Sequence, residues 1–179
     1  TACNNVADAV RGADLVLLAV PVAATQTCLQ AMRDALSPDA LLMDVGSTKC
    51  DVVQAARATL GDRLSCFVPA HPIAGKEVAG IEHADASLYQ DRCLVLTPLD
   101  ETNPERTQRA HDLWQRLGSR VVQLTANEHD AAFAAVSHLP HLLAFGLMQS
   151  IMRQPQGALF LSMAGPGFRD FSRIAGSVA

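Results

Sequence analysis

The sequence DVGSTK (residues 44–49) joins a short apolar run directly to a helical pattern. The first N–H groups of a helix have no partner inside the helix, so a helix that begins here could offer them to an anionic or polar group of a ligand. In open α/β sheets, ligands bind at the carboxyl ends of the strands, where this turn is expected. The alternative is that Ser47 or Thr48 simply caps the helix.

A histidine follows the next apolar run, in the segment HPIAGKE (residues 71–77). Pro72 restricts the backbone of His71 to extended geometry, and Gly75 permits a tight turn. An imidazole titrates near neutral pH, so a histidine held rigidly at the end of a sheet is suited to proton transfer. A structural role stays open as the alternative, because the sequence does not show what His71 contacts.

Two further histidines lie three residues apart in SHLPH (residues 137–141). His138 and His141 could bind zinc, but Pro140 is expected to break the helix between them, and no cysteine lies at zinc-like spacing. We therefore expect no metal site, and one of the two histidines should face a cleft at a helix start. The remaining histidines, which are expected at the surface, are His83, His111 and His129.

Two arginines follow a Gly-Pro-Gly turn in the sequence GPGFRDFSRI (residues 165–174). Arg169 and Arg173 are four residues apart, and a guanidinium group can bind a carboxylate through two parallel hydrogen bonds. These arginines therefore either bind an acidic substrate or form structural ion pairs with Asp170 or Glu77.

Short apolar runs alternate with helical patterns over the first two-thirds of the chain. Continuous apolar runs of this length are typical of strands that are buried on both faces of a sheet. Alternation of strands and helices predicts a mostly parallel sheet of the α/β class. The expected strands are residues 15–20, 41–45, 66–68, 93–96 and 120–124.

Three helices are expected between these strands. The first carries apolar residues at positions 28, 32 and 36 and stops at the Ser-Pro pair 37–38. The second carries apolar residues at 52, 53, 56 and 60 and stops at Gly61. The third has Asn103 as its N-cap and Pro104 as its first residue, and it ends at Gly118.

The pattern changes near residue 125. Residues 127–152 and 158–163 show only helical patterns rich in Ala and Leu, with a break expected at Pro140. We therefore predict an α/β domain over residues 1–125, followed by an all-α domain over residues 126–179.

Composition restricts the class of protein. Hydrophobic residues make up 49% and charged residues 18%, which excludes disorder as the main state. The net charge of −4 argues against a nucleic-acid partner and against a basic patch on an anionic membrane. The five cysteines are odd in number and form no CxxC pair, which favours reduced thiols and a cytoplasmic location.

Membrane and targeting segments are not expected. No uninterrupted apolar run reaches the ~18–20 residues that span a bilayer. The longest, near residues 15–24, contains Pro21, and the N-terminal sequence TACNN lacks the features of a signal peptide. Because the first residue is Thr, we expect the chain to be a piece of a longer protein.

Taken together, five segments make the sequence resemble the prephenate/arogenate dehydrogenase (cyclohexadienyl dehydrogenase) family. They are AVP (19–21), DVGSTK (44–49), HPIAGKE (71–77), SHLPH (137–141) and GFRDFSRIA (167–175), in the order of the family. The resemblance implies oxidative decarboxylation of prephenate to 4-hydroxyphenylpyruvate, or of arogenate to tyrosine, with NAD or NADP. It also implies a Rossmann-like nucleotide-binding domain and a helical domain that forms a homodimer.

The resemblance also implies roles for individual residues. His71 matches the catalytic histidine, which accepts the proton of the ring hydroxyl, and Ser47 lies near that hydroxyl and the nicotinamide. Arg173 matches an arginine that binds a substrate carboxylate, His141 lines the substrate pocket, and Glu77 is an acid of the cleft. The residues expected to line the cofactor site are Ala19, Val20, Pro21, Gly46, Ser47 and Thr48.

The chain departs from the family in one respect, because it has no GxGxxG turn for the pyrophosphate. We therefore expect the first strands of the domain and the end of the helical domain to be missing. A sheet edge and an apolar face should then be uncovered, and this piece alone should not bind NAD tightly.

Three alternatives remain. A β-hydroxyacid dehydrogenase would carry a catalytic lysine on a helix of its second domain, but no lysine follows Lys76. A non-catalytic module could retain the fold without the cofactor turn. A metal hydrolase would use His138 and His141.

Overall fold

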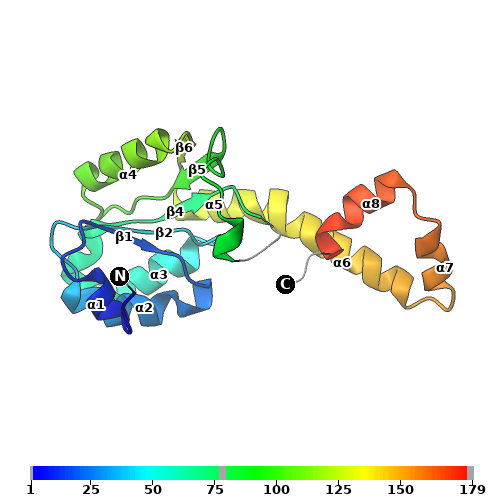
Figure 1. Cartoon of the computed structure of the whole chain (residues 1–179), viewed down its shortest axis with the longest axis horizontal. Helices are drawn as coiled ribbons and strands as arrows, with labels where there is room; N and C mark the ends of the chain where they lie inside the picture. The colour runs from blue at the N-terminus through cyan, green and yellow to red at the C-terminus, as the bar shows by residue number, and fades with distance from the viewer. Residues whose placement is uncertain (1, 77–79, 177–179) are drawn as a thin grey trace. The chain divides into compact units, whose positions relative to one another are not determined.

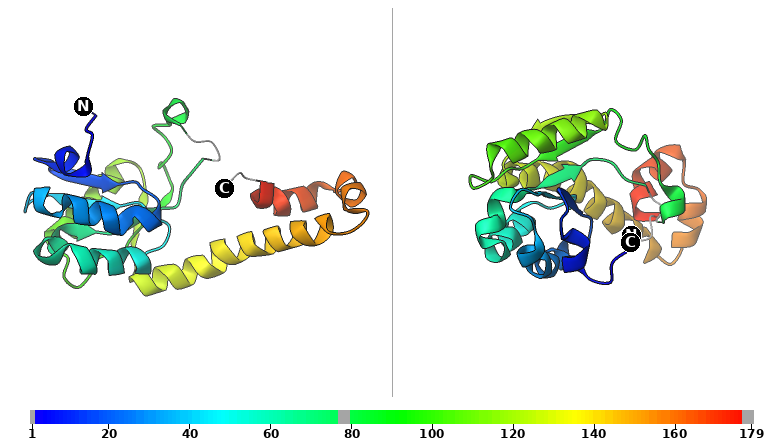
Figure 2. Two further views of the ribbon diagram at one scale, coloured as in Figure 1. Left: turned by 90° about the horizontal axis from the view of Figure 1, so that it is seen from below. Right: turned by 60° about the vertical axis from the view of Figure 1, so that its left-hand side comes forward.

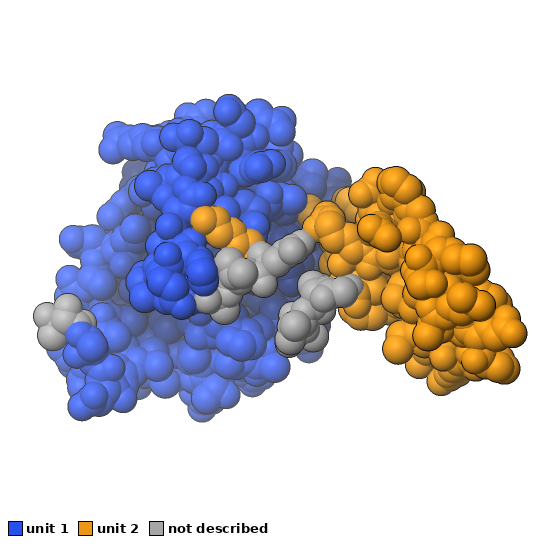
Figure 3. All heavy atoms as spheres, turned by 45° about the vertical axis from the view of Figure 1, so that its right-hand side comes forward, with its two compact units in different colours: residues 1–75, 80–130 blue, residues 76–79, 131–179 orange. Residues whose placement is uncertain are grey.

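The computed structural model describes residues 2–76 and 80–176. The chain divides into two compact units, coloured separately in Figure 3. The first comprises residues 1–75 and 80–130, and the second comprises residues 76–79 and 131–179. The first unit is of the α/β class and the second is helical, which agrees with the alternation seen in the sequence.

The first unit begins with a parallel three-stranded sheet in the order β1-β2-β3. Its strands are β1 (Leu15–Leu18), β2 (Leu41–Asp44) and β3 (Phe67–Val68). The helices that alternate with them are α1 (Val6–Val10), α2 (Thr25–Met32) and α3 (Cys50–Thr59). Short 3-10 segments follow at Val22–Ala24, Arg33–Ala35 and Gly61–Cys66.

A second three-stranded sheet has the order β4-β5-β6. Its strands are β4 (Ala70–Pro72), β5 (Cys93–Leu96) and β6 (Arg120–Gln123). Strand β4 is antiparallel to β5, whereas β5 and β6 are parallel and are connected through α4 (Pro104–Arg116). A 3-10 segment, Ile81–His83, lies between β4 and β5.

Two apolar cores lie on opposite faces of β2. Leu42 packs with α2 and α3, while Leu41 and Met43 pack with Trp114 of α4 and Leu94 of β5. Figure 1 shows α1, α2 and α3 on one side of β2 and α4 on the other. All four residues of β2 are therefore buried, as expected for a central strand.

The prediction that the strands are buried on both faces of a sheet is wrong for β1 and β6. Leu15 and Leu17 of β1 are 40% and 46% exposed, and Val122 of β6 is 42% exposed. Strand β1 pairs only with β2 among the described strands, and α1 and α2 cover only one of its faces. Its exposed leucines agree with the uncovered edge and apolar face that the sequence analysis expects.

The third expected strand also differs from the prediction. Strand β3 contains only Phe67 and Val68, and after Pro69 the chain resumes as β4 in the other sheet. Pro69 has no N–H group, but its carbonyl accepts a hydrogen bond from Thr97 at 2.9 Å. His71 therefore has the extended backbone that Pro72 predicts, and it lies within a strand opposite Val95 of β5.

Helix α4 follows its sequence signals closely. The Asn103 side chain accepts a hydrogen bond from the N–H of Glu105 at 2.8 Å, and Pro104 is the first helical residue. Gly118 has a φ of +86°, the left-handed geometry that favours glycine after a helix. The apolar side of α4 is buried at Ala110 and Trp114, whereas Leu117, just after the helix, is 45% exposed.

The helical region contains four α-helices in the described residues. They are α5 (Ala126–Phe133), α6 (Leu139–Met152), α7 (Gly157–Ser162) and α8 (Pro166–Ser172), and a 3-10 segment, Arg173–Gly176, follows. Helices α7 and α8 fold back beside α6 (Figure 2).

The expected helix break at Pro140 is wrong. A π-helical segment, Ala134–His138, connects α5 to α6 without interruption, and Pro140 lies in the first turn of α6. The N–H of Leu139 bonds to the carbonyl of Ala134, one residue further back than in an α-helix. Pro140 therefore follows a widened turn inside a continuous helix and does not end it.

The continuous helix Ala126–Met152 is long and apolar enough, by length and composition alone, to cross a membrane. This segment differs from the expectation that no apolar run is long enough to span a bilayer. The most apolar 18-residue stretch of this helix has a mean hydropathy of 1.5, and only 6% of that stretch is buried among the described residues. A single helix of this kind is weak evidence for a membrane span, because core and interface helices of other proteins have the same composition.

One buried ion pair ties the two sheets of the first unit together. Lys49 Nζ donates to Asp44 Oδ2 at 2.5 Å and to the carbonyl of Ala70 at 2.8 Å. Asp44 in turn accepts from the N–H of Gly46 at 2.7 Å and from that of Ala70 at 3.2 Å. The end of β2 and the start of β4 are therefore held by the same two side chains, which are 3% and 0% exposed.

Burial raises the pKa of Asp44 and lowers the pKa of Lys49, and the attraction between the two groups opposes both shifts. Each group therefore depends on the other to remain charged in the interior.

Lys49→Met leaves the Asp44 carboxylate buried without its cation. We expect this substitution to lower the free energy of unfolding by about 3–5 kcal/mol, which urea unfolding of the full-length protein measures. The double variant Asp44→Asn/Lys49→Met carries no buried charge and should recover part of that loss. A double variant less stable than Lys49→Met alone would show that the two side chains stabilise the fold independently.

Candidate active site

The turn after β2 lies against the turn after β1. The N–H of Val45 donates to the carbonyl of Leu18 at 3.3 Å, so the two strand ends are in contact. A Cβ atom added to Gly46 would lie 2.9 Å from Asp44 Oδ2 and 3.4 Å from Val22. Glycine is therefore needed for this close approach. The segments 19–21 and 46–48 lie at the same edge of the sheet.

The start of helix α3 has a partner from a distant part of the chain. Lys49 is the N-cap residue, and Asp130 accepts the N–H groups of Lys49 and Cys50 at 2.8 Å each. Two interpretations from the sequence are therefore wrong. Neither Ser47 nor Thr48 caps the helix, and these two N–H groups are not offered to a ligand anion, because the carboxylate of α5 already occupies them.

His71 lies at the end of a chain of side chains that leads to the same carboxylate. Its Nδ1 atom is 2.8 Å from Nε2 of His129, and Nδ1 of His129 is 2.7 Å from Oδ1 of Asp130. The two imidazole rings meet edge to face, with centroids 5.0 Å apart. His71 is half-buried. We refer to Asp130, His129 and His71 as the histidine chain.

The expectation that His129 lies at the surface is wrong. Its side chain is 0% exposed, because it fits between His71 of β4 and Asp130 of α5. The sequence separation of 58 residues between the two histidines leaves no spacing signal. The only available signal was local, namely the adjacent pair His129-Asp130 at the start of a helix.

The histidine chain ends at a firmly ionised carboxylate. Burial alone would raise the pKa of Asp130, but the hydrogen bonds that it accepts, chiefly from the N–H groups of Cys50 and Lys49 and from His129, outweigh burial and lower it to about 2. The same carboxylate, through hydrogen bonding and together with burial, raises the pKa of the Cys50 thiol to about 11. Cys50 is therefore protonated at neutral pH and is a poor nucleophile.

The other predicted residues lie partly outside this cluster. Glu77 is outside the described residues. Ser47 is exposed in the turn after β2. His141 on α6 and Arg173 after α8 belong to the second unit, where both side chains are exposed and the segment with Arg173 packs against α6.

The expected Gly-Pro-Gly turn is instead a helix start. Gly165 is the N-cap of α8 and Pro166 is its first residue. Arg169 therefore lies inside α8, and Arg173 begins the next 3-10 segment. In residues 2–76 and 80–176, no group of three or more His, Cys, Asp or Glu side chains is placed to hold a metal ion.

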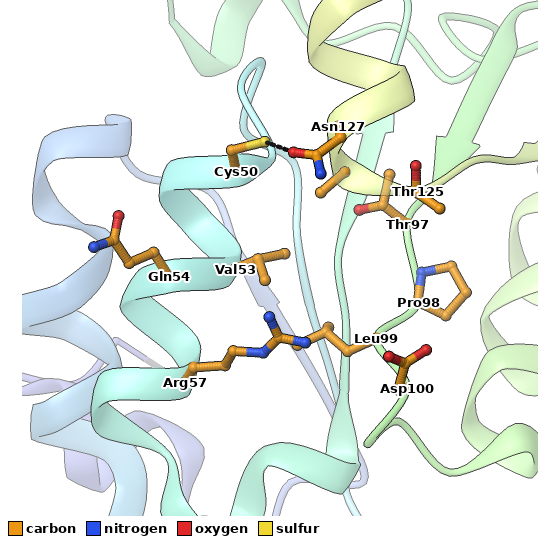
Figure 4. Close-up of a pocket in the computed structure, with 11 residues that line it drawn as sticks. Cys50, Val53, Gln54, Arg57, Thr97, Pro98, Leu99, Asp100, Thr125 and Asn127 are labelled. Atoms are coloured by element: carbon orange, nitrogen blue, oxygen red, sulfur yellow. Dashed lines mark hydrogen bonds between the residues drawn. The ribbon is translucent and has the colours of Figure 1, made fainter.

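A cavity of about 420 Å³ lies between α3 and the segment that follows β5 (Figure 4). Arg57, one of its charged side chains, pairs with Glu101 at 3.1 Å, and the thiol of Cys50 donates to Asn127 at 3.2 Å. Of the predicted catalytic and cofactor residues, none lines this cavity. The cavity lies near the start of α3, where Cys50 and Asn127 line it.

Asp130→Asn should reveal how far the charge of this residue stabilises the start of α3. Near neutral pH we expect a loss of about 1–2 kcal/mol in the free energy of unfolding, as for other helix caps. The folded pKa of about 2 lies below the ordinary value of 3.8, so this stabilisation is complete above the ordinary value and is lost as the pH falls through about 2. Urea unfolding at several pH values should show the wild-type advantage shrinking in acid, whereas a constant difference would mean that the charge contributes nothing.

Comparison with known proteins places this geometry in a family. Residues 1–123 match the family model for the nucleotide-binding domain of prephenate dehydrogenase. Residues 125–178 match the model for its dimerization domain. The two models together cover nearly the whole chain.

Characterised relatives agree with these matches. A cyclohexadienyl dehydrogenase from Zymomonas mobilis is 36% identical over 177 residues, which are 97% of this chain and 59% of that protein. A prephenate dehydrogenase from Lactococcus lactis is 35% identical over 91% of this chain and 45% of that protein. The chain therefore spans about half the length of these relatives.

Solved structures extend the likeness to the fold. A prephenate dehydrogenase from A. aeolicus, in complex with hydroxyphenyl propionate and NAD+, has a TM-score of 0.83 and 36% identity over 92% of this chain and 57% of that one. An arogenate dehydrogenase from Synechocystis has a TM-score of 0.82 and 29% identity, over 98% of this chain and 63% of that one. The predicted fold class, a Rossmann-like domain followed by a helical domain, is confirmed. With both family models matched in order along its length, the chain belongs to the prephenate dehydrogenase family.

Proposed function

We propose that the full-length protein containing this chain catalyses the NAD- or NADP-dependent oxidative decarboxylation of prephenate or arogenate. The observation that carries this proposal is the placement of His71, half-buried in β4 and bonded through Nδ1 to a buried histidine. An imidazole held in this way can accept a proton in a fixed direction. Family membership supplies the reaction class.

The proposal divides the chain by role. Residues 1–125 form part of the dinucleotide-binding domain, and residues 126–179 form part of the substrate and dimerisation domain. The helical domain exposes many large apolar side chains, as expected for a surface that a second copy covers. The proposed assembly is a cytoplasmic homodimer. These exposed side chains include Val136, Leu139, Leu142, Leu143, Phe145, Met152, Leu159, Phe160, Met163 and Phe171.

The carboxyl ends of β1 and β2 fit a dinucleotide. Gly46 lacks a side chain where the two turns meet, and the Oγ1 atom of Thr48 is buried without a hydrogen-bond partner among the described residues. Ala19, Val20 and Pro21 would form the facing wall of the cofactor site. The bound nicotinamide would supply the hydride acceptor, with Ser47 close to it.

His71 acts on the ring hydroxyl of the substrate. Its neutral imidazole accepts the hydroxyl proton while the hydride leaves the same carbon, and the carboxylate of the ring departs as CO₂ as the ring becomes aromatic. Aromatisation drives this loss, so the protein contributes position and charge placement. Arg173 would hold a substrate carboxylate, His141 would line the pocket, and Glu77 would belong to the polar network of the cleft.

His71→Asn in the full-length protein tests the proposal. We expect kcat to fall by about 10²-fold or more, the usual range for loss of a general base, with little change in the affinity for NAD. Absorbance of the reduced nicotinamide, measured with each substrate and each cofactor, gives the rates. His111→Asn makes the same substitution on α4 and should leave the rates unchanged. Normal turnover of His71→Asn would remove this residue from the mechanism.

Arg173→Gln tests the second proposed contact. An arginine that only anchors a carboxylate should stabilise the bound substrate and the transition state alike, so we expect mainly a higher KM. Arg153→Gln, at the end of α6, is the matched control. A fall in kcat at unchanged KM would contradict the anchoring role.

A further inference from the structure

The two ring nitrogens of His71 are not equivalent. A neutral imidazole carries one proton, so one nitrogen donates a hydrogen bond and the other accepts one. A base must present the accepting nitrogen to its substrate. The protein therefore has to determine which nitrogen of His71 holds the proton, and the contacts of His71 Nδ1 decide this.

Asp130 sets the direction of the hydrogen bonds. Its carboxylate accepts the N–H groups of Lys49 and Cys50, and its pKa of about 2 keeps it ionised at neutral pH. An ionised carboxylate can only accept, so His129 must donate to it from Nδ1. In a neutral His129, Nε2 is then the accepting nitrogen.

The same reasoning applies to the imidazole ring of His71. His129 Nε2 lies 2.8 Å from His71 Nδ1, so His71 must donate from Nδ1. The proton of neutral His71 is therefore on Nδ1, and Nε2 carries the lone pair. When Nε2 takes up a proton, the charge stays on the His71 ring, and the hydrogen bond to His129 and the negative charge of Asp130 stabilise it.

We propose that His129 and Asp130 are positioning residues that fix the tautomer and orientation of His71, so that Nε2 is the base. This inference rests on the proposed function, because it assigns the reacting nitrogen of the same site. The arrangement follows the general logic by which a carboxylate orients a histidine base through its other nitrogen, here with a second imidazole in between.

Burial supports a specific role for His129. Its side chain is 0% exposed, so water cannot replace either of its hydrogen bonds. A buried imidazole costs free energy unless both nitrogens are bonded, and an apolar residue would fill the same space without this cost. Of the two residues whose N–H groups Asp130 accepts, Lys49 directs its side chain to Asp44 and Ala70, and Cys50 donates its thiol to Asn127.

The tautomer can be measured without any turnover. In full-length protein labelled with ¹⁵N-histidine, long-range ¹H–¹⁵N spectra distinguish a protonated Nδ1 from a protonated Nε2, and the spectrum of His71→Asn assigns the signal. Above the pH at which His71 is charged, we expect the proton on Nδ1. A proton on Nε2 of His71 in the wild-type protein would overturn the proposal.

Kinetics of His129 variants test the consequence. His129→Leu removes the acceptor for His71 Nδ1, and kcat should fall by about 10²- to 10⁴-fold, as when a histidine base loses the group that fixes its tautomer. KM should change little, because His129 is buried. His129→Gln retains an oxygen that can accept the same proton, so its kcat should lie between those of His129→Leu and the wild type.

His111→Leu, on α4 and outside the histidine chain, is the control and should retain wild-type rates. A purely structural role for His129 predicts lower stability with unchanged kcat of the folded protein, and that result would contradict the proposal. Absence of turnover by the wild-type protein would overturn the proposed function instead. In that case the tautomer measured by ¹⁵N spectra still decides whether the histidine chain is as assigned.

Discussion

The buried pair of Lys49 and Asp44 is the interaction on which the rest of the site depends. It joins β2 of one sheet to Ala70 of the other, immediately before His71. Removal of either charge would leave the other uncompensated in the interior, which is far more costly than the loss of a surface ion pair. The position of His71 is therefore set by a contact that stabilises the whole α/β unit.

The start of α3 links this pair to the chemistry. Lys49 uses its side chain to hold the strand ends and its backbone N–H to bind Asp130. Asp130 then bonds to His129, which bonds to His71. The sequence suggests an anion site at the turn after β2. An anion does bind two N–H groups of the helix that begins there, but this anion is the side chain of Asp130.

Local sequence signals predicted the elements that depend on neighbouring residues. Asn103, Pro104 and Gly118 determine the ends of α4 through their own backbone preferences, so these bounds could be read directly. The histidine chain could not, because His71 and His129 are 58 residues apart and Lys49 and Asp130 are 81 apart. Such contacts depend on the three-dimensional fold. A single sequence does not show which distant side chains come into contact. The π-helical turn before Pro140 was also missed, because a proline is expected to end a helix, whereas here the helix continues through a widened turn.

The carboxylate of Asp130 serves the helix and the imidazoles at once, which couples local order to reactivity. Unwinding of the first turn of α3 would remove the two N–H groups that Asp130 accepts, and the proposed orientation of His129 and His71 would lose this support. In the proposed arrangement, an intact first turn therefore helps to hold His71 with Nε2 deprotonated. On the proposed mechanism, the order of a helix end therefore contributes to reactivity although no atom of that turn needs to touch the substrate.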